Sequence, residues 1–143
     1  MNIDKKCLVL TQYRQGDSYN DFIGKFYHFP TNSSKNYESM FDSFPIEFVY
    51  YEPIKNGEGV FYGYGIIDAP PFKDKQDNNY SFVEIKEYRP FAKVVSYKNG
   101  QGEIIEQKYN PDSYNYNNAV RRINKDFLDS VCLDGHILLN FES

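Results

Sequence analysis

The residues best suited to chemistry in this chain are one histidine and two nearby carboxylates. His28 follows Asp17 and Asp21 closely in the sequence, and a histidine beside a carboxylate can act as a general acid and base. An aspartate in a turn near a hydrogen-bonded histidine explains the same residues, because catalysis needs a geometry that spacing does not supply. The phosphate loop GxxxxGK[ST] and the nucleophile elbow GxSxG are missing, and the Gly-x-Gly at residues 63–65 lacks the third glycine of a dinucleotide fingerprint. We therefore expect a protein that binds a ligand and is not an enzyme by itself.

Basic residues in two parts of the chain could contact phosphates. The denser group precedes and enters the last expected helix, and the other lies near the first expected strand; the candidates are Arg121, Arg122 and Lys125, and Lys5, Lys6, Arg14 and Lys25. Such charge runs usually form a solvated face, and the functional interpretation is a phosphate-contacting rim around a pocket. The whole chain has a net charge of −4 and a pI of about 5.2. That balance argues against non-specific nucleic-acid binding but allows a local basic face.

Metal and membrane chemistry have little support in the sequence. Cys7 and Cys132 form no CxxC pair, and with only His28 and His136 besides, no cluster has metal-ligand spacing. We expect no metal, no cofactor, and two reduced, buried thiols. The N-terminus leads into a run of only four apolar residues, and no stretch is long enough to span a bilayer. These features predict a cytoplasmic protein without a membrane partner.

The composition favours a single domain rich in β structure. The 143 residues include 14 Tyr and 12 Phe but no Trp, and Tyr and Phe favour strands. Most such rings belong to a core, although flat rings can also stack on a planar ligand. We expect one domain over residues 1–143, with its core at about residues 7–134.

The hydrophobic pattern predicts several short strands and few helices. Strands are expected at residues 7–10, 46–52, 60–68, 80–88 and 91–97, beside an aromatic-rich segment at 24–30 that ends at a proline. Residues 37–44 and 125–133 have helical spacing, with Asn124 as the N-cap of the second helix. This pattern predicts a mainly β (α+β) fold, a curled β-barrel with a few short helices. Gly63 and Gly65 would share one face of their strand, which indicates a strong bend or the close approach of a ligand.

The segment at residues 19–30, YNDFIGKFYHFP, matches the pattern Tyr-x-Asp-x-x-Gly-x-x-Tyr-His-aromatic-Pro. It resembles the opening motif of EVE-like domains of the PUA superfamily, which occur at the N-termini of modification-dependent, HNH-type restriction endonucleases. Further segments agree in order, namely FVYYE at 48–52, YGYGII at 62–67, EYRPFAKVV at 87–95 and AVRRI at 119–123. The loop at residues 31–36 is longer and more polar than this pattern, and the chain contains no nuclease signature.

The resemblance implies a PUA-like barrel that holds a flipped base in an aromatic-lined pocket. Relatives of this kind recognise 5-methylcytosine or 5-hydroxymethylcytosine in double-stranded DNA. Carried over by position, the residues that would line the base pocket or its wall are Tyr19, Asp21, Tyr27, His28, Phe29, Thr11, Gln12, Tyr13, Tyr62 and Tyr64. The phosphate contacts would come from Arg121, Arg122, Lys125, Arg14 and Lys25.

Three functions remain open at this point. The favoured one is the modified-DNA recognition domain of a bacterial restriction system, with a nuclease domain in the same or an associated chain. A PUA-like module for RNA or a modified nucleotide is the second. A small hydrolase similar to ASCH domains is the third, and it would need Asp21 and His28 to converge.

Overall fold

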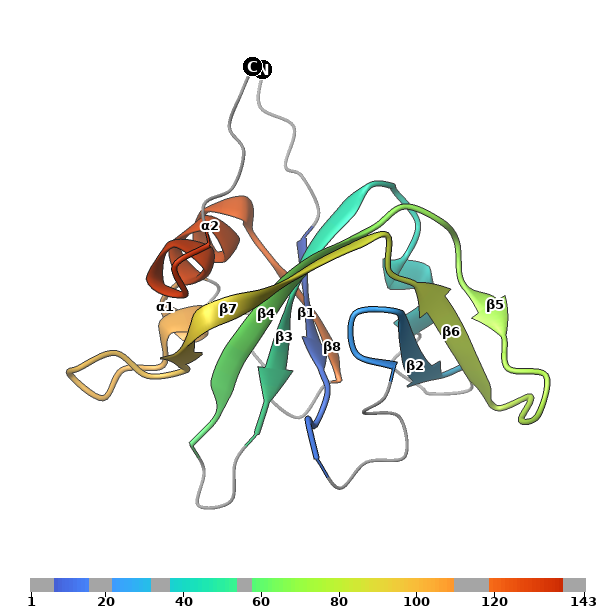
Figure 1. Ribbon diagram of the computed structural model, residues 1–143, viewed down its shortest axis with the longest axis horizontal. Coiled ribbons are helices and arrows are strands. Elements are labelled where there is room, and N and C mark those ends of the chain that lie inside the picture. The colour runs from blue at the N-terminus through green and yellow to red at the C-terminus, as the bar shows by residue number, and fades with distance from the viewer. Residues whose placement is uncertain (1–6, 16–21, 32–36, 54–57, 110–118, 138–143) are drawn as a thin grey trace.

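The computed structural model describes residues 7–15, 22–31, 37–53, 58–109 and 119–137 (Figure 1). Five strands form a mixed sheet in the order β7-β4-β3-β1-β8. Its members are β1 (Cys7–Thr11), β3 (Ile46–Glu52), β4 (Val60–Ile67), β7 (Glu87–Ser96) and β8 (Val120–Ile123). Strand β1 is parallel to β3 and antiparallel to β8, so its C-terminal end lies beside the C-terminal end of β3.

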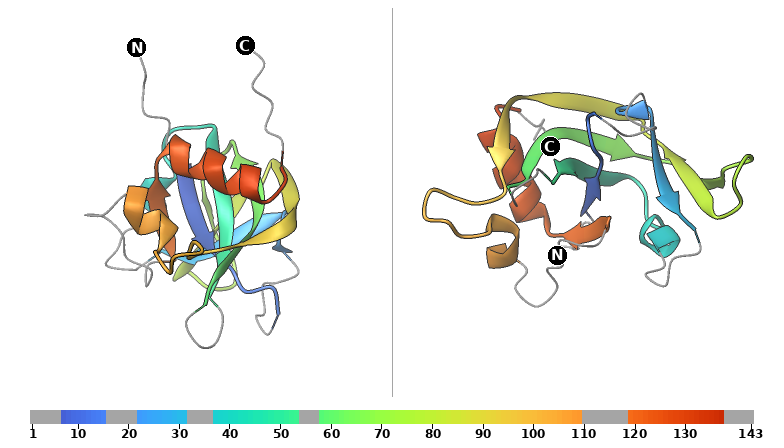
Figure 2. Two further views of the ribbon diagram at one scale, coloured as in Figure 1. Left: turned by 90° about the vertical axis from the view of Figure 1, so that its left-hand side faces the viewer. Right: turned by 90° about the horizontal axis from the view of Figure 1, so that it is seen from below.

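A smaller antiparallel sheet has the order β2-β6-β5. Its strands are β2 (Phe26–Pro30), β5 (Phe72–Lys73) and β6 (Tyr80–Glu84). The helical elements are the one-turn 3-10 helix η2 (Tyr37–Met40), α1 (Ile105–Tyr109) and α2 (Lys125–Asp134). Figure 2 shows α2 against the five-stranded sheet on the side away from β2 and β6. The fold is therefore mainly β with a few short helices, as the sequence predicts.

The alternation of side chains along the strands divides the apolar residues between two cores. One core lies between the two sheets and contains Leu8 and Leu10 of β1. The other lies under α2 and contains Cys7 and Val9 of the same strand. Because β1 is buried on both faces, its residues 7–10 form a continuous apolar run, which is typical of a central strand.

Most expected elements are present, and the differences have physical causes. The strands at 7–10, 46–52 and 60–68 are confirmed, as is the last helix, whose N-cap Asn124 accepts from the Phe127 N–H at 2.8 Å. The helix expected at 37–44 is reduced to one 3-10 turn. The expected break before residue 91 is wrong: the chain breaks after Glu84, and Pro90 lies inside β7. A proline is tolerated there because β7 is an edge strand.

The glycines of β4 make room for the protein's own rings. A Cβ on Gly63 would lie 2.5 Å from the Tyr88 hydroxyl, and one on Gly65 would overlap the Phe48 ring. The alternative that these glycines admit a ligand to the backbone is thus not needed to explain them. Their role is close packing inside a curved sheet.

We predict that Asn124→Ala lowers the free energy of unfolding by about 1 kcal/mol, because the first turn of α2 loses its capping acceptor. Urea denaturation gives the difference. Asp134→Ala at the other end of the helix is the control, with a change within about 0.5 kcal/mol. Equal losses in both variants would contradict the capping role.

Candidate functional site

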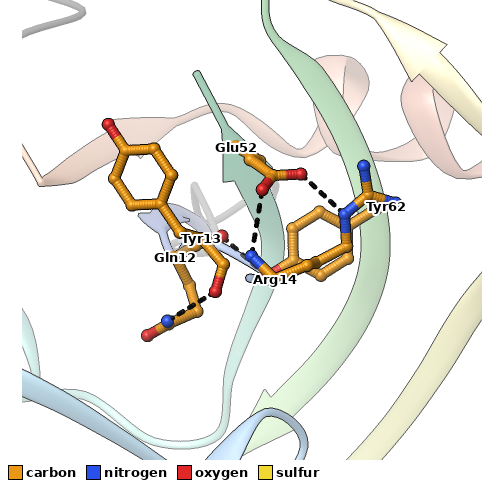
Figure 3. Close-up of polar contacts among 5 residues, drawn as sticks. All are labelled: Gln12, Tyr13, Arg14, Glu52 and Tyr62. Atoms are coloured by element: carbon orange, nitrogen blue, oxygen red, sulfur yellow. Dashed lines mark hydrogen bonds and ion pairs between the residues drawn. The ribbon is translucent and has the colours of Figure 1, made fainter. Parts of the chain in front are cut away.

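The candidate site lies where the chain leaves β1. The Gln12 N–H donates to the Tyr51 carbonyl at 2.9 Å, which keeps the segment after β1 beside the end of β3. Gln12, Tyr13 and Arg14 then meet Glu52, the last residue of β3, and Tyr62 of β4. We call these five residues the Arg14 cluster (Figure 3). Three of its members were expected to line the pocket and Arg14 to contact phosphate, whereas Glu52 was not singled out.

Arg14 is held by two contacts to one carboxylate. Its Nε lies 2.6 Å from Oε1 of Glu52, and its backbone N–H donates to Oε2 at 3.0 Å. The guanidinium carbon lies 4.9 Å from the centroid of the Tyr62 ring, within the range of a cation–π interaction. The Arg14 side chain remains 42% exposed while that of Glu52 is 13% exposed. A surface cation is thus oriented above a buried ring.

The Tyr62 ring is fixed from beneath by other aromatic residues. Its hydroxyl donates to the Gln12 carbonyl at 2.9 Å. Tyr50 stacks on it with a centroid distance of 5.2 Å and an interplanar angle of 5°, and the Tyr50 hydroxyl accepts from the Gly24 N–H at 3.0 Å. Burial raises the pKa of both hydroxyls far above the ordinary value. Both tyrosines therefore stay neutral and support a rigid aromatic platform.

Tyr88 completes this platform at the edge. Its ring meets Tyr50 edge-on at 5.4 Å. Burial raises the pKa of Tyr88 to about 12, and the positive charge of Arg14 opposes that rise.

A β-bulge separates two tyrosines that the sequence places on one face. Tyr50 pairs with Gly63 but Tyr51 pairs with Phe61, so Tyr62 is an extra residue in β4. Tyr62 consequently faces the core between the sheets, and Tyr64 faces the core under α2. The Tyr64 hydroxyl donates to Glu47 Oε2 at 2.6 Å. The prediction that Tyr64 lines the base pocket together with Tyr62 is therefore wrong.

Tyr27 and Phe29 are core residues and offer no face to solvent. Their exposed fractions are 2% and 0%, and the Tyr27 hydroxyl donates to the carbonyls of Thr11 and Ala119 at 3.1 and 3.3 Å. The expectation that Tyr27 and Phe29 line the base pocket or its wall is corrected to a supporting role, because alternation along β2 turns both into the core between the sheets. Tyr27 thereby ties β2 to the end of β1.

His28 lies on the opposite face of β2 from Tyr27, and so faces away from that core. Its Nε2 is 3.1 Å from Oδ2 of Asp74, and its ring stacks on Tyr80 at 4.6 Å. The backbone N–H of Gln76 and then His28 lower the pKa of the Asp74 carboxyl. His28 is thus corrected from a pocket residue to an anchor for the turn after β5. Its partner Asp74 lies too far along the sequence for spacing to indicate it.

Some predicted site residues fall elsewhere. Tyr19 and Asp21 lie outside the described residues, as does Asp17. Thr11 ends β1, where alternation with Leu10 turns its side chain toward the α2 side. Its hydroxyl is buried and has no hydrogen-bond partner within the described ranges. Thr11 therefore contributes its backbone to this region, through the bond from Tyr27.

The predicted phosphate contacts divide into buried and exposed residues. Arg121 is 5% exposed and forms two 2.8 Å bonds to the carboxylate of Glu106, so its assignment as a phosphate contact is wrong. The cause is alternation on β8, which turns Arg121 toward the core under α2 and leaves Arg122 exposed. Lys125 forms ion pairs with Glu47 at 3.0 Å and with Asp129 at 2.9 Å. Its charge is therefore neutralised within the protein. Lys25 is exposed, as a phosphate contact requires.

Metal ligation and membrane spanning have no support in the described part of the chain. No group of three or more His, Cys, Asp or Glu residues there could hold a metal ion. None of the described helices is both long enough and apolar enough to cross a membrane.

Comparison with known proteins identifies the fold but no family. No protein-family model and no curated protein match the chain. The NMR structure of Rpa0253 from Rhodopseudomonas palustris is similar, with 13% identity, a TM-score of 0.60, and coverage of 96% of this chain and 97% of that chain. The crystal structure of Atu2648 from Agrobacterium tumefaciens has 12% identity, a TM-score of 0.62, and coverage of 96% and 98% respectively. At such identities the likeness shows a shared fold alone.

We predict that Arg121→Met lowers the free energy of unfolding by about 3–5 kcal/mol, because Glu106 is left buried without its partner. Arg122→Met is the matched control from the next position, with a change within about 0.5 kcal/mol. Urea denaturation of both variants decides the matter. Similar stability in the two variants would contradict the assignment of Arg121 to the core.

We predict that Asp74→Asn makes the free energy of unfolding less dependent on pH in the acidic range. A carboxyl with a lowered pKa contributes stability above its unfolded pKa of about 3.9 and loses it as the pH falls through the folded value. The variant should therefore be less stable than the unchanged protein at pH 7. It should also lose less of its stability when the pH falls from 5 to 2. Thermal unfolding over that range measures the slope, and parallel curves for the two proteins would refute the role of Asp74.

Proposed function

We propose that this chain recognises a modified base, 5-methylcytosine or 5-hydroxymethylcytosine, in double-stranded DNA. The observation that carries the proposal is the Arg14 cluster, in which an oriented cation lies over the rigid Tyr62 ring and the neighbouring Tyr13 is 45% exposed (Figure 3). Residues 19–30 resemble the EVE-like motif, and the described pocket candidates of that motif, Tyr27, His28 and Phe29, support the fold around the cluster. That motif leads into β2, whose Tyr27 is bonded to the end of β1.

The chemistry of the cluster suits a base taken out of a duplex. Extruding a base costs a few kcal/mol of stacking and pairing, and stacking on an aromatic side chain returns about 1–3 kcal/mol per base. Tyr13 is the most accessible ring of the cluster. The Gln12 carboxamide donates to the backbone carbonyl of Tyr13 and keeps its own oxygen as an acceptor for the edge of a base.

Phosphate contacts complete the proposal. Lys25 and Arg122 are exposed, and Arg14 is partly exposed. A few such contacts give a modest dependence on salt, which suits an acidic chain that binds one site specifically. On this proposal the chain is a recognition module in the cytoplasm, and any cleavage of DNA comes from a nuclease domain in the same or an associated chain.

The proposal predicts tighter binding to a duplex with one modified cytosine than to the same duplex with cytosine. Fluorescence anisotropy with 5-methyl, 5-hydroxymethyl and unmodified duplexes over a range of salt measures the preference. In a further experiment, an RNA of the same sequence is added as a competitor of the labelled DNA duplex. Equal affinity for the three duplexes would overturn the proposal, and stronger competition by RNA would replace DNA as the ligand.

Two variants assign the preference to the cluster. Tyr13→Ala should weaken binding by about 1–3 kcal/mol if the ring stacks on the base, and Arg14→Gln should reduce the salt dependence by about one phosphate contact. Arg89→Gln is the matched control, because Arg89 is also 42% exposed and paired with a glutamate, Glu87, at 3.0 Å. It should bind like the unchanged protein. A loss as large as that of Arg14→Gln would place the interface elsewhere.

A further inference from the structure

We infer that the ring face of Tyr62 under Arg14 is the stacking surface for the base, and that Arg14 occupies this surface until the base arrives. The inference rests on the proposed function and goes further, because it assigns the subsite, its ligand class and the residue that Glu52 controls. The ligand class is an uncharged planar heterocycle. The argument follows from what lies against Tyr62.

Two planar groups from the described segments lie against Tyr62. Tyr50 stacks on it with an interplanar angle of 5°, and the guanidinium of Arg14 lies 4.9 Å from its centroid. Tyr50 is buried and its hydroxyl is bonded to the backbone of Gly24, so it cannot leave. Arg14 belongs to the segment after β1 and is partly exposed. A base that reaches Tyr62 must therefore displace Arg14.

The guanidinium is a suitable stand-in for a base. It is planar, delocalised and weakly hydrated, so it packs on an aromatic face much as a heterocycle does. Without it, the Tyr62 ring would lose a planar partner on the side that the base would use. By occupying the ring face, the Arg14 guanidinium keeps the space above Tyr62 filled and so preserves the arrangement of the surrounding residues.

Among the described residues, Glu52 contributes two contacts that hold Arg14 in place. Its two oxygens bind the Arg14 side chain and backbone at 2.6 and 3.0 Å, and its own side chain is largely buried. When a base takes the ring face, the guanidinium is released from Tyr62 and can turn to a phosphate of the same DNA, which is a strong bidentate acceptor. Arg14 would then oppose binding of the base alone but favour binding of the whole duplex.

Opposite effects on two ligands test this inference. The first is 5-methyl-2′-deoxycytidine, which is neutral and has no phosphate, and the second is a duplex containing 5-methylcytosine. Arg14→Ala should bind the nucleoside about fivefold more tightly, because the ring face is vacant, and the duplex about fivefold more weakly, because a phosphate contact is lost. NMR titration and anisotropy give the two affinities. Glu52→Gln should also strengthen nucleoside binding, since Arg14 is held less firmly.

The controls separate this mechanism from simple charge effects. Removing a cation should not alter affinity for a neutral nucleoside, so Arg89→Ala, in a second exposed arginine–glutamate pair, should leave nucleoside affinity unchanged. In the unchanged protein, the Arg14 Nε–H resonance should move when the nucleoside is added, because it leaves the Tyr62 ring. That readout needs no variant and so does not depend on the folding of one.

The outcomes also distinguish this inference from the proposed function. Nucleoside affinity that is unmeasurable, unchanged or lower in Arg14→Ala overturns the assignment of the Tyr62 face, even if modified duplexes are preferred. Opposite changes for nucleoside and duplex, combined with no preference for the modified duplex, would support the stacking site and overturn the proposed recognition of modified DNA.

Discussion

The extra residue in β4 is the constraint on which the site depends. With Tyr50 paired to Gly63 and Tyr51 to Phe61, Tyr62 rotates onto the side of the sheet that Tyr50 occupies. A regular strand would give Tyr62 and Tyr64 one face and leave Arg14 without a ring beneath it. The bulge lies where strands β1 and β3 end, so the inward ring meets the segment after β1 and the carboxylate at the end of β3. One inserted residue thus brings three strands together at one cluster.

The two cores use their polar groups differently. Under α2, cations are neutralised by carboxylates, as Arg121 is by Glu106 and Lys125 by Glu47. The Arg121–Glu106 pair is buried and fixes α1 on the sheet, and the partly exposed Lys125–Glu47 pair ties α2 to β3. At the end of β1 the pair formed by Arg14 and Glu52 is partly exposed and lies on an aromatic platform. An exposed pair holds its geometry at a small energetic cost, and so can be exchanged for a ligand.

The sequence predicted strands and the last helix well, because buried strands such as β1 and a capped amphipathic helix have strong local patterns. It also singled out Gln12, Tyr13 and Arg14, which the structure brings together in the Arg14 cluster. The prediction failed for residues whose orientation depends on contacts with distant parts of the chain. Tyr64 was misplaced by a bulge that depends on strand pairing, Arg121 by the burial of its partner Glu106, and His28 by the face of β2 on which it lies. None of these three has a signal in local spacing.

The central claim is that a cytosine modified at its 5-position leaves the duplex and stacks within the Arg14 cluster. A 13C label on the 5-methyl group reports this directly, because a methyl beside an aromatic face is shifted upfield by the ring current. On adding the protein to a labelled duplex, we expect an upfield shift of the methyl signal together with nuclear Overhauser effects to the ring protons of Tyr13 and Tyr62. A methyl signal that keeps its duplex position while the DNA is fully bound would contradict the account.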